Sequence, residues 1–395
     1  MYNSGMLRDR YLTSLIVDDL KDKMVFVGGP RQVGKTTLCR DLVAARFKSH
    51  AYFNWDNRAD RKAIMASSWP GDADILIFDE THKYRQWKGL IKGEYDKLKK
   101  NYKFLVTGSA RLDLYRRGGD SLQGRYHYYR LHPFTLAEIE GIRQKMSVLG
   151  NLPIGKDYHQ ETLNRLDAFG GFPEPFMKQD KRNLRRWHNE KVERMFREDI
   201  QDIEAIRDIG NMKLLSDMLP SKVGSLLSLN AIRENLEVSF RAVSHWMDVL
   251  EAFYYHFRIY PFSARRIRSL KKEPKLYLWD WSEVEDEAAR FENLVASHLL
   301  KLVHFITDYE GYKAELCFLR DVDKREVDFL VTIGGKPWFA VESKLNDASL
   351  SPHLLYFKER LSIPSVFQVV KKGAVDRIER GARIVSAGKF LTGLI

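Results

Sequence analysis

The sequence has little cysteine and no long apolar run. Its two cysteines, Cys39 and Cys317, are too few for a disulfide framework or a cysteine zinc site. No stretch approaches the roughly 18–20 apolar residues of a membrane helix. The first residues interleave acids and bases without the apolar core of an export signal. We therefore expect a protein of the reducing cytoplasm with no membrane partner.

What the chain does contain is apolar residues and positive charge. Hydrophobic residues make up 44% of its 395 residues and aromatics 12%, which is enough for real cores and for more than one domain. Lysine and arginine total 65 against 53 acids, giving a net charge of +12. This excess suits a polyanion such as nucleic acid, although a surface adapted only for solubility would account for it equally well.

Four domains are expected: an α/β core over 1–140, a helical lid over 141–205, a helix-turn-helix module with a basic linker over 206–275, and a last α/β domain over 276–395. The first alternates helical stretches with short apolar runs, which predicts an α/β fold with a parallel sheet. The expected strands are 24–27, 50–55, 75–78, 104–106 and 126–131.

The middle of the chain reads as helical. Two glycines and two prolines at 170–175 predict a bend in the lid. Three closely spaced helices, expected at 212–223, 229–236 and 240–255, suit a helix-turn-helix or winged helix. In the third helix Phe240, Val243, Met247 and Leu250 are expected to point inward, and Arg241, Ser244, His245 and Asp248 outward.

Two segments concentrate positive charge. The linker 258–275 carries seven bases against one acid, and it either follows a nucleic-acid backbone or is a solvated linker. The second segment lies near the lid, and it either binds a polyanion or supplies cations to a neighbouring subunit's nucleotide. Its members are Lys181, Arg182, Arg185, Arg186 and Lys191.

A phosphate-binding loop is the most specific motif. Residues 29–36 fit G-x-x-x-x-G-K-[ST] at every required position, between a predicted strand and a predicted helix. Backbone amides of such a loop wrap the β-phosphate, Lys35 reaches the β- and γ-phosphates, and the Thr36 hydroxyl ligates Mg²⁺. A chance glycine turn is the alternative. The expected nucleotide-binding residues are Gly29, Pro30, Arg31, Gln32, Val33, Gly34, Lys35, Thr36 and Thr37.

An acidic pair ends the apolar run 75–78. In a parallel sheet that strand tip lies beside the phosphate loop, so Asp79 is expected to hold Mg²⁺ and Glu80 to activate the attacking water. The pair could instead cap the turn that follows.

Two further residues are candidates for the same chemistry. Ser109 follows the strand 104–106 and either contacts the γ-phosphate or caps a helix. Arg125 is a candidate arginine finger or sensor, because developing phosphoryl charge needs a nearby cation. The alternatives are a solvated Arg125 and the use of Arg111 in its place. An arginine acting in trans would require a homo-oligomer.

These motifs resemble prokaryotic AAA-type ATPases of the archaeal-ATPase branch. The resemblance rests on GGPRQVGKTT, ILIFDE and VTGS in the core, on GRYHYYRLHPFTLAEI and GGFPEP after it, and on EVDFLV and AVESK in a C-terminal domain of uncharacterised function. It covers nearly the whole chain. It implies an ATP-binding, ATP-hydrolysing P-loop core with a helical lid, and it does not identify the client.

Carboxylates in the last domain form a second pattern. Asp328 lies in an expected strand 326–333, and Glu342 and Lys344 share one face of the next strand across a turn at Gly334 and Gly335. Carboxylates for Mg²⁺ and a lysine near the attacking water are what phosphodiester hydrolysis needs. The pattern is similar to restriction-endonuclease-like folds, with Glu292 matching their first-helix glutamate. A structural salt bridge at the ends of these strands would produce the same residue pattern.

Three functions follow from these patterns. The first is an ATPase whose nucleotide state controls engagement of DNA, including branched or damaged DNA, through the winged-helix and nuclease-like domains. The second is an ATP-gated signalling or defence switch that acts on a protein partner. The third is an ATP-dependent nuclease that cuts with Asp328, Glu342 and Lys344.

Overall fold

A computed structural model describes residues 9–108, 122, 124–200, 208–263, 272–347 and 349–395. The chain forms two compact units. The first comprises Met1–His132, Lys191–Ile206 and Ala252–Tyr254, and the second comprises Pro133–Glu190, Arg207–Glu251 and Tyr255–Ile395. The segment predicted as a lid and the three predicted helices therefore fall mostly in the same unit as the C-terminal sheet.

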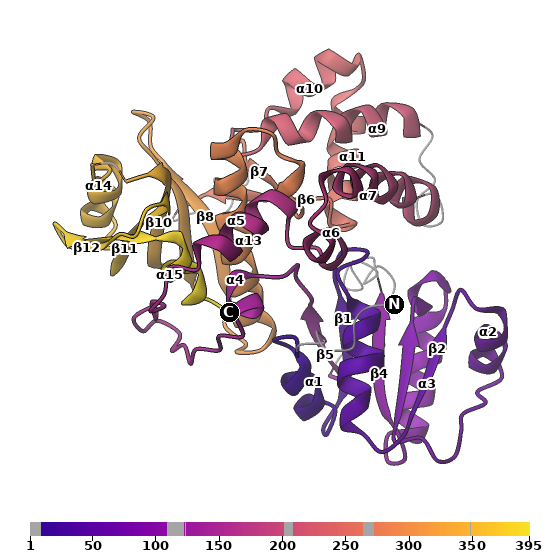
Figure 1. Ribbon diagram of the computed structural model, residues 1–395. Helices are drawn as coiled ribbons and strands as arrows, with labels where there is room; N and C mark the ends of the chain where they lie inside the picture. The colour runs from indigo at the N-terminus through magenta and orange to yellow at the C-terminus, as the bar shows by residue number, and fades with distance from the viewer. Residues whose placement is uncertain (1–8, 109–121, 123, 201–207, 264–271, 348) are drawn as a thin grey trace. The chain divides into compact units, whose positions relative to one another are not determined.

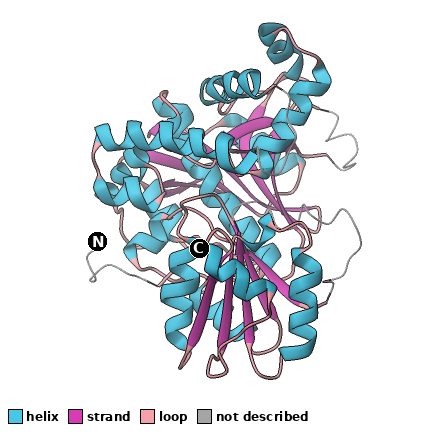
Figure 2. Cartoon of the chain, turned by 90° about the vertical axis from the view of Figure 1, so that its right-hand side faces the viewer, coloured by secondary structure: helices cyan, strands magenta, loops and turns pink. Residues whose placement is uncertain are grey.

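The first unit is built on a parallel sheet in the order β2-β3-β4-β1-β5, with helices on both faces (Figures 1 and 2). All its strand pairs are parallel, as the alternating pattern predicted. Its elements are α1 (Thr13–Asp19), β1 (Met24–Gly28), η1 (Thr37–Val43), η2 (Ala44–Arg46), β2 (His50–Asn54), α2 (Arg58–Met65), β3 (Ile75–Asp79), η3 (Thr81–Lys83), α3 (Trp87–Leu98), β4 (Lys103–Gly108), β5 (Tyr126–Arg130) and η5 (Met195–Ile200).

Strands β1 and β3 of this sheet are buried at every position. Continuous apolar runs produce this because a central parallel strand is covered on both faces. Phe26, Phe78 and Phe104 pack with Trp87 of α3 and Ile64 of α2 on one face. The sheet therefore holds its strand ends, where the predicted site lies, on a rigid base.

The second unit contains an eight-stranded mixed sheet in the order β12-β13-β11-β10-β9-β8-β6-β7 among the described residues. Its strands are β6 (His256–Pro261), β7 (Lys275–Leu278), β8 (Ala314–Arg320), β9 (Glu326–Ile333), β10 (Lys336–Asn346), β11 (Ser365–Lys372), β12 (Asp376–Glu379) and β13 (Ala382–Ser386). The turn between β9 and β10 is confirmed, since Gly334 and Gly335 have φ of +58° and +80° and Ile333 pairs with Lys336.

Helices cover this sheet and extend from it. The long helix α13 contacts β7, β8, β9 and β10. The helical elements are α4 (Leu136–Glu140), α5 (Gln160–Phe169), α6 (Pro173–Lys178), α7 (Lys181–Arg194), α9 (Ile209–Met218), η6 (Leu219–Lys222), α10 (Leu229–Leu236), α11 (Phe240–Ala252), η7 (Trp281–Glu283), α13 (Glu287–Asp308), α14 (Pro352–Arg360) and α15 (Ala387–Thr392). In the described part of the chain, every helix is too short or too polar to cross a membrane.

The structure corrects two details of the helical middle. The predicted bend at 170–175 is shorter, because Pro173 takes the first position of α6, where its missing N–H costs nothing. Phe240, expected to point inward, is 50% exposed at the first position of α11, and Trp246 is buried instead.

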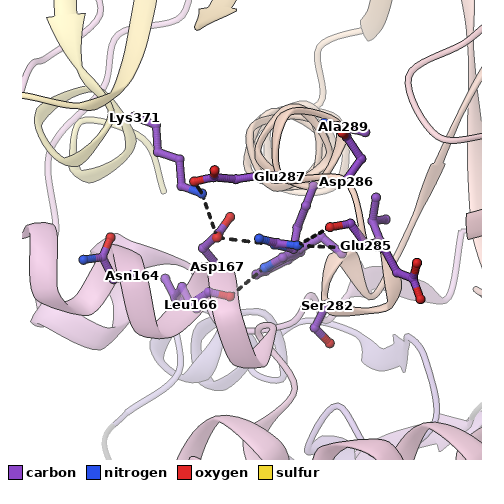
Figure 3. A network of polar contacts seen from close by, with 12 residues as sticks. Asn164, Leu166, Asp167, Ser282, Glu285, Asp286, Glu287, Ala289 and Lys371 are labelled. Atoms are coloured by element: carbon purple, nitrogen blue, oxygen red, sulfur yellow. Dashed lines mark hydrogen bonds and ion pairs between the residues drawn. The ribbon is translucent and has the colours of Figure 1, made fainter. Parts of the chain in front are cut away.

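A buried ionic network joins α5 to the C-terminal sheet (Figure 3). Asp167 of α5 accepts hydrogen bonds from Lys371 of β11 at 2.8 Å and from Arg290 of α13 at 3.3 Å. Lys371 also pairs with Glu287 at 3.1 Å, and Trp281 donates its indole N–H to the Leu166 carbonyl. These contacts explain why the predicted lid groups with the second unit.

Candidate functional site

The loop after β1 has a backbone that only particular residues can adopt. Gly29 and Gly34 have φ of +152° and +97°, and Gln32 has φ of 63°. A Cβ on Gly29 would lie 2.5 Å from the Leu131 carbonyl oxygen, so this position requires glycine. Pro30 and Val33 are buried, Arg31 is half-buried and Thr37 is exposed. The helical backbone then begins at Lys35.

The loop brings its lysine and threonine to the end of β3. Lys35 is 6% exposed, and its ammonium donates hydrogen bonds to the carbonyls of Gly29 at 3.0 Å and Pro30 at 2.8 Å. The Thr36 hydroxyl donates to Asp79 Oδ2 at 2.8 Å. The threonine hydroxyl and the carboxylate therefore meet at the end of β3, and the lysine is held within the loop itself.

Strand β4 lies between β1 and β3, so its tip adjoins both halves of the site. Thr107 pairs with Asp79 on one side and with Val27 on the other. Ser109, the residue predicted to reach the nucleotide from this tip, lies outside the described residues, as does Arg111.

Glu80 follows Asp79 in a left-handed conformation, with φ of 56° and ψ of 15°. That conformation is uncommon for a residue other than glycine, and such residues concentrate at functional sites. Two backbone bonds hold it there: Glu80 N–H donates to the Thr107 carbonyl at 3.0 Å, and Lys83 N–H donates to the Glu80 carbonyl at 3.1 Å.

Three residues of this region were not predicted from the sequence. Arg10 is buried and donates to the carbonyls of Val33 and His132, which braces the loop. Tyr52 of β2 donates to Asp79 Oδ2 at 2.6 Å, and burial together with this carboxylate raises the pKa of Tyr52. His82 packs behind Glu80. Only His82 carried a sequence signal, its position two residues after the acidic pair.

Arg125 is not brought together with the loop. It precedes β5 at the edge where β1 starts, and its carbonyl accepts from Met24 N–H, whereas the loop follows the other end of β1. Its guanidinium pairs with Asp96 of α3 at 2.8 Å. The prediction that Arg125 acts at the nucleotide of its own chain is therefore corrected, because the length of β1 separates Arg125 from the phosphate loop. A role for Arg125 in trans stays a prediction.

The predicted carboxylates of the second unit do gather. Asp328 Oδ2 accepts from the backbone N–H and the hydroxyl of Ser343 at 2.8 and 2.7 Å. Lys344 donates to Glu342 Oε1 at 2.8 Å, and Glu342 Oε2 is buried with no hydrogen-bond partner among the described residues. Glu292 of α13 accepts from the Tyr277 hydroxyl at 2.6 Å.

Lys275 lies in the middle of these acids, which the sequence did not suggest. Its ammonium is 2.7 Å from Glu326, 3.3 Å from Glu292 and 3.8 Å from Asp328, and its side chain is 3% exposed. Burial by itself would lower the pKa of Lys275, but the three carboxylates raise it above its ordinary value.

This placement corrects the predicted basic linker at both of its ends. Lys275 is a buried strand residue, and Arg258 of β6 pairs with Glu251 and, at 2.7 Å, with Asp248. Both side chains form ion pairs with acidic residues of the same unit, so neither is available to a phosphate backbone. Of the bases between them, Arg265, Arg266, Arg268 and Lys271 lie outside the described residues, and Lys272 is exposed.

Two glutamates in this cluster have perturbed pKa values. Burial, reinforced by the charge of Asp328, raises the pKa of Glu292 and that of Glu342 to about 7 each. Both therefore hold protons in the folded state at pH values where an unfolded chain has lost them.

The sign of the resulting pH dependence follows directly. Between about pH 4.5 and pH 7 the folded state binds more protons than the unfolded state, so the free energy of unfolding falls as pH rises. In EDTA, the unfolding midpoint of the second unit is expected to drop by several degrees from pH 5 to pH 8. Glu342→Gln should flatten this dependence, because an amide does not titrate in that range. The exposed Glu359→Gln is the control, and an unchanged slope in Glu342→Gln would contradict the raised pKa.

A third polar group, His188, Asp280 and Glu283, has ligand-type atoms within 4.8 Å of one another. Ser282 Oγ donates to Asp280 Oδ1 at 2.6 Å and lies 3.0 Å from His188 Nε2, and the Tyr255 hydroxyl donates to Glu283 at 3.2 Å. These mutual contacts explain why the three side chains lie together, and the group has a structural role in capping η7.

Comparison with known proteins identifies the first of these sites. Residues 21–140 match the model of an AAA domain, and they contain the loop, the Thr36–Asp79 contact and Glu80. This part of the chain is an AAA-type P-loop domain. Two domains of unknown function follow the AAA domain, DUF8612 over residues 160–283 and DUF4143 over 288–390.

The curated relatives that match most of the chain are uncharacterised proteins. One from Mycobacterium tuberculosis is 22% identical over 89% of this chain and 74% of its own length. Another, from Methanocaldococcus jannaschii, is 23% identical over 84% of this chain and 77% of its own length. These matches extend beyond the AAA domain into both domains of unknown function.

Solved structures give weaker matches. A signal transduction ATPase of the STAND class from Pyrococcus horikoshii, with a tetratricopeptide repeat sensor, has 13% identity and a TM-score of 0.27, and it covers 75% of this chain. This chain spans about half, 47%, of that protein. The C. elegans protein PCH-2 has 13% identity and a TM-score of 0.22, covering 62% of this chain and 66% of its own. Such scores do not show a shared overall fold.

Proposed function

We propose that the AAA domain binds and hydrolyses ATP in the presence of Mg²⁺. The observation that carries the proposal is the hydrogen bond from Thr36 to Asp79, which places the loop hydroxyl and the strand-end carboxylate where one metal ion could contact both. Bound Mg²⁺ would neutralise charge on the phosphates during their transfer.

The residues present fit this ligand. The glycine loop has the positive φ angles that let backbone amides converge on an anion, and Gln32 Oε1 is buried without a hydrogen-bond partner among the described residues. The Lys35 ammonium donates hydrogen bonds to the Gly29 and Pro30 carbonyls, which holds it at the loop where a phosphate would bind. Glu80 stands beside Asp79, where a general base is needed.

The test is phosphate release by the full chain with Mg²⁺ or with EDTA. Turnover is expected only with Mg²⁺, and Asp79→Asn should abolish it, whereas Asn at the exposed Asp72 should not. Magnesium-dependent binding without any release of phosphate would reduce the proposal to nucleotide binding.

Lys35→Ala tests the phosphate contacts separately. We expect ATP affinity to fall about 10- to 100-fold, because a charge-assisted hydrogen bond is worth roughly 1.5–3 kcal/mol. A fluorescent ATP analogue titrated into the protein measures the change. Lys100→Ala, at an exposed lysine of the same unit, is the matched control. Equal affinities for the two variants would remove Lys35 from the site.

We further propose that nucleotide state controls engagement of DNA by the second unit. Helices α9, α10 and α11 are followed by the hairpin β6–β7, and Leu226 bridges to Lys275, an order of elements that fits a winged helix. Helix α7 carries exposed Lys181, Arg182, Arg185 and Arg186, which suit a phosphate backbone. The gathered Asp328, Glu342 and Lys344 favour a nuclease-like site in the same unit.

If the second unit engages DNA, ATP turnover should rise when single-stranded, duplex or branched DNA is added. This stimulation should fall steeply between roughly 50 and 200 mM salt, because contacts with phosphates weaken as salt increases. Arg185→Ala with Arg186→Ala should weaken it, and Lys313→Ala with Lys336→Ala, at exposed sites, should not. Turnover indifferent to every DNA form would favour the protein-directed switch. Magnesium-dependent nicking lost in Lys344→Ala would establish the nuclease.

A further inference from the structure

His82 lies directly behind the proposed catalytic glutamate. It belongs to the short turn η3, two residues after Glu80, and it is 4% exposed. Its Nε2 is 3.6 Å from Glu80 Oε2, just beyond hydrogen-bond distance. The Glu80 side chain is 18% exposed, so it reaches solvent while the ring behind it is buried.

The ring's protonation state follows from its surroundings. Burial, with help from the charges of Lys35 and Lys83, lowers the pKa of His82 to about 3, so the imidazole is neutral and carries one N–H. The Nδ1 atom is buried with no hydrogen-bond partner in the described part of the chain. Placing the proton on Nε2, facing a carboxylate, avoids burying an unmatched donor at Nδ1.

We propose that His82 is a positioning residue for Glu80. Two backbone hydrogen bonds fix the Glu80 backbone in its left-handed conformation, so the orientation of its carboxylate is set by the side-chain torsions. A small rotation of Glu80 brings Oε2 within hydrogen-bond distance of the Nε2–H, and that bond holds the carboxylate in one orientation toward the attacking water. The inference rests on the proposed ATP hydrolysis and adds the residue that orients its base.

Two amide substitutions test this because they imitate different ring atoms. The amide nitrogen of glutamine reaches about as far from Cβ as Nε2 does, whereas that of asparagine lies near the position of Nδ1. His82→Asn should lower kcat by about 10- to 100-fold, the range for a lost hydrogen bond to a charged group. Affinity for a fluorescent ATP analogue should stay within about threefold of the wild type, since His82 itself contacts no nucleotide. His82→Gln should recover most of the lost rate.

A double-mutant cycle separates positioning from structural damage. In a Glu80→Gln background, measured by single turnover, His82→Asn should produce no further loss, because its partner carboxylate is already gone. Thermal unfolding midpoints of both variants check that the domain folds. If His82→Ala does not fold, the Asn and Gln pair still decides the question.

The inference is overturned if His82→Asn turns over ATP at the wild-type rate, if Gln is no better than Asn, or if the same loss recurs without the Glu80 carboxylate. Each of these results requires an active wild-type protein. A wild-type protein that hydrolyses no ATP would instead overturn the proposed function, so the two failures are distinguishable.

Discussion

Glu80→Gln is expected to slow ATP hydrolysis by about 10²- to 10⁴-fold, the range that a general base contributes, and to leave ATP binding nearly unchanged. The substitution keeps the size and hydrogen-bonding reach of the side chain but removes the carboxylate that would accept a proton from water. The backbone of Glu80 is held by main-chain hydrogen bonds with Thr107 and Lys83, which the substitution leaves in place, so the local fold should persist.

Single-turnover phosphate release and nucleotide titration give the two quantities. Glu193→Gln, at an exposed helical position, is the control for loss of a negative charge. The Glu80→Gln protein should accumulate in its ATP-bound form. Turnover close to the wild-type rate would show that another group activates the water.

Lys275→Met is expected to lower the free energy of unfolding of the second unit by about 3–5 kcal/mol, the usual cost of removing one partner from a buried charge pair. Without its ammonium, Glu292, Glu326 and Asp328 would share a buried space with one cation fewer. The loss should shrink at pH 5, because two of the glutamates present in the cluster, Glu292 and Glu342, accept protons near pH 7.

Denaturant unfolding at pH 5 and pH 8 measures this effect. Lys272→Met, three residues earlier and exposed, is the matched control and should change stability by only a few tenths of a kcal/mol, as roughly expected for surface substitutions. A loss in Lys275→Met that is equal at both pH values would argue that shape, rather than charge, makes Lys275 necessary.

The sequence predicted strands and turns well wherever the residues of the segment itself determine them. The five strands of the first sheet begin and end within two residues of the expected bounds, and three of them (β1, β3 and β4) are short apolar runs closed by glycine or acidic residues. The same holds for β9 and the turn at Gly334 and Gly335. The AAA domain was expected from its loop, and its match to the family model confirms that assignment.

What escaped prediction depends on contacts between distant segments. Lys275 reads as one base in a basic run, and only the pairing of β7 within the sheet places it among acids from α13 and β9. Arg10 reaches the phosphate loop from more than twenty positions away, and no periodicity marks it. Arg125 follows a plausible motif, but its distance from the loop depends on which end of β5 it occupies.

The way the chain passes between its two units has a consequence for their assembly. It leaves one unit for the other after residues 132, 190, 206, 251 and 254, so the units are joined by five covalent connections rather than by a single tether. No single cut in the backbone can release either unit as an intact piece, and a truncation after residue 132 would remove two segments from the first. Each unit must therefore assemble from stretches of chain that are separated in sequence by parts of the other, and neither can complete its fold from one continuous segment.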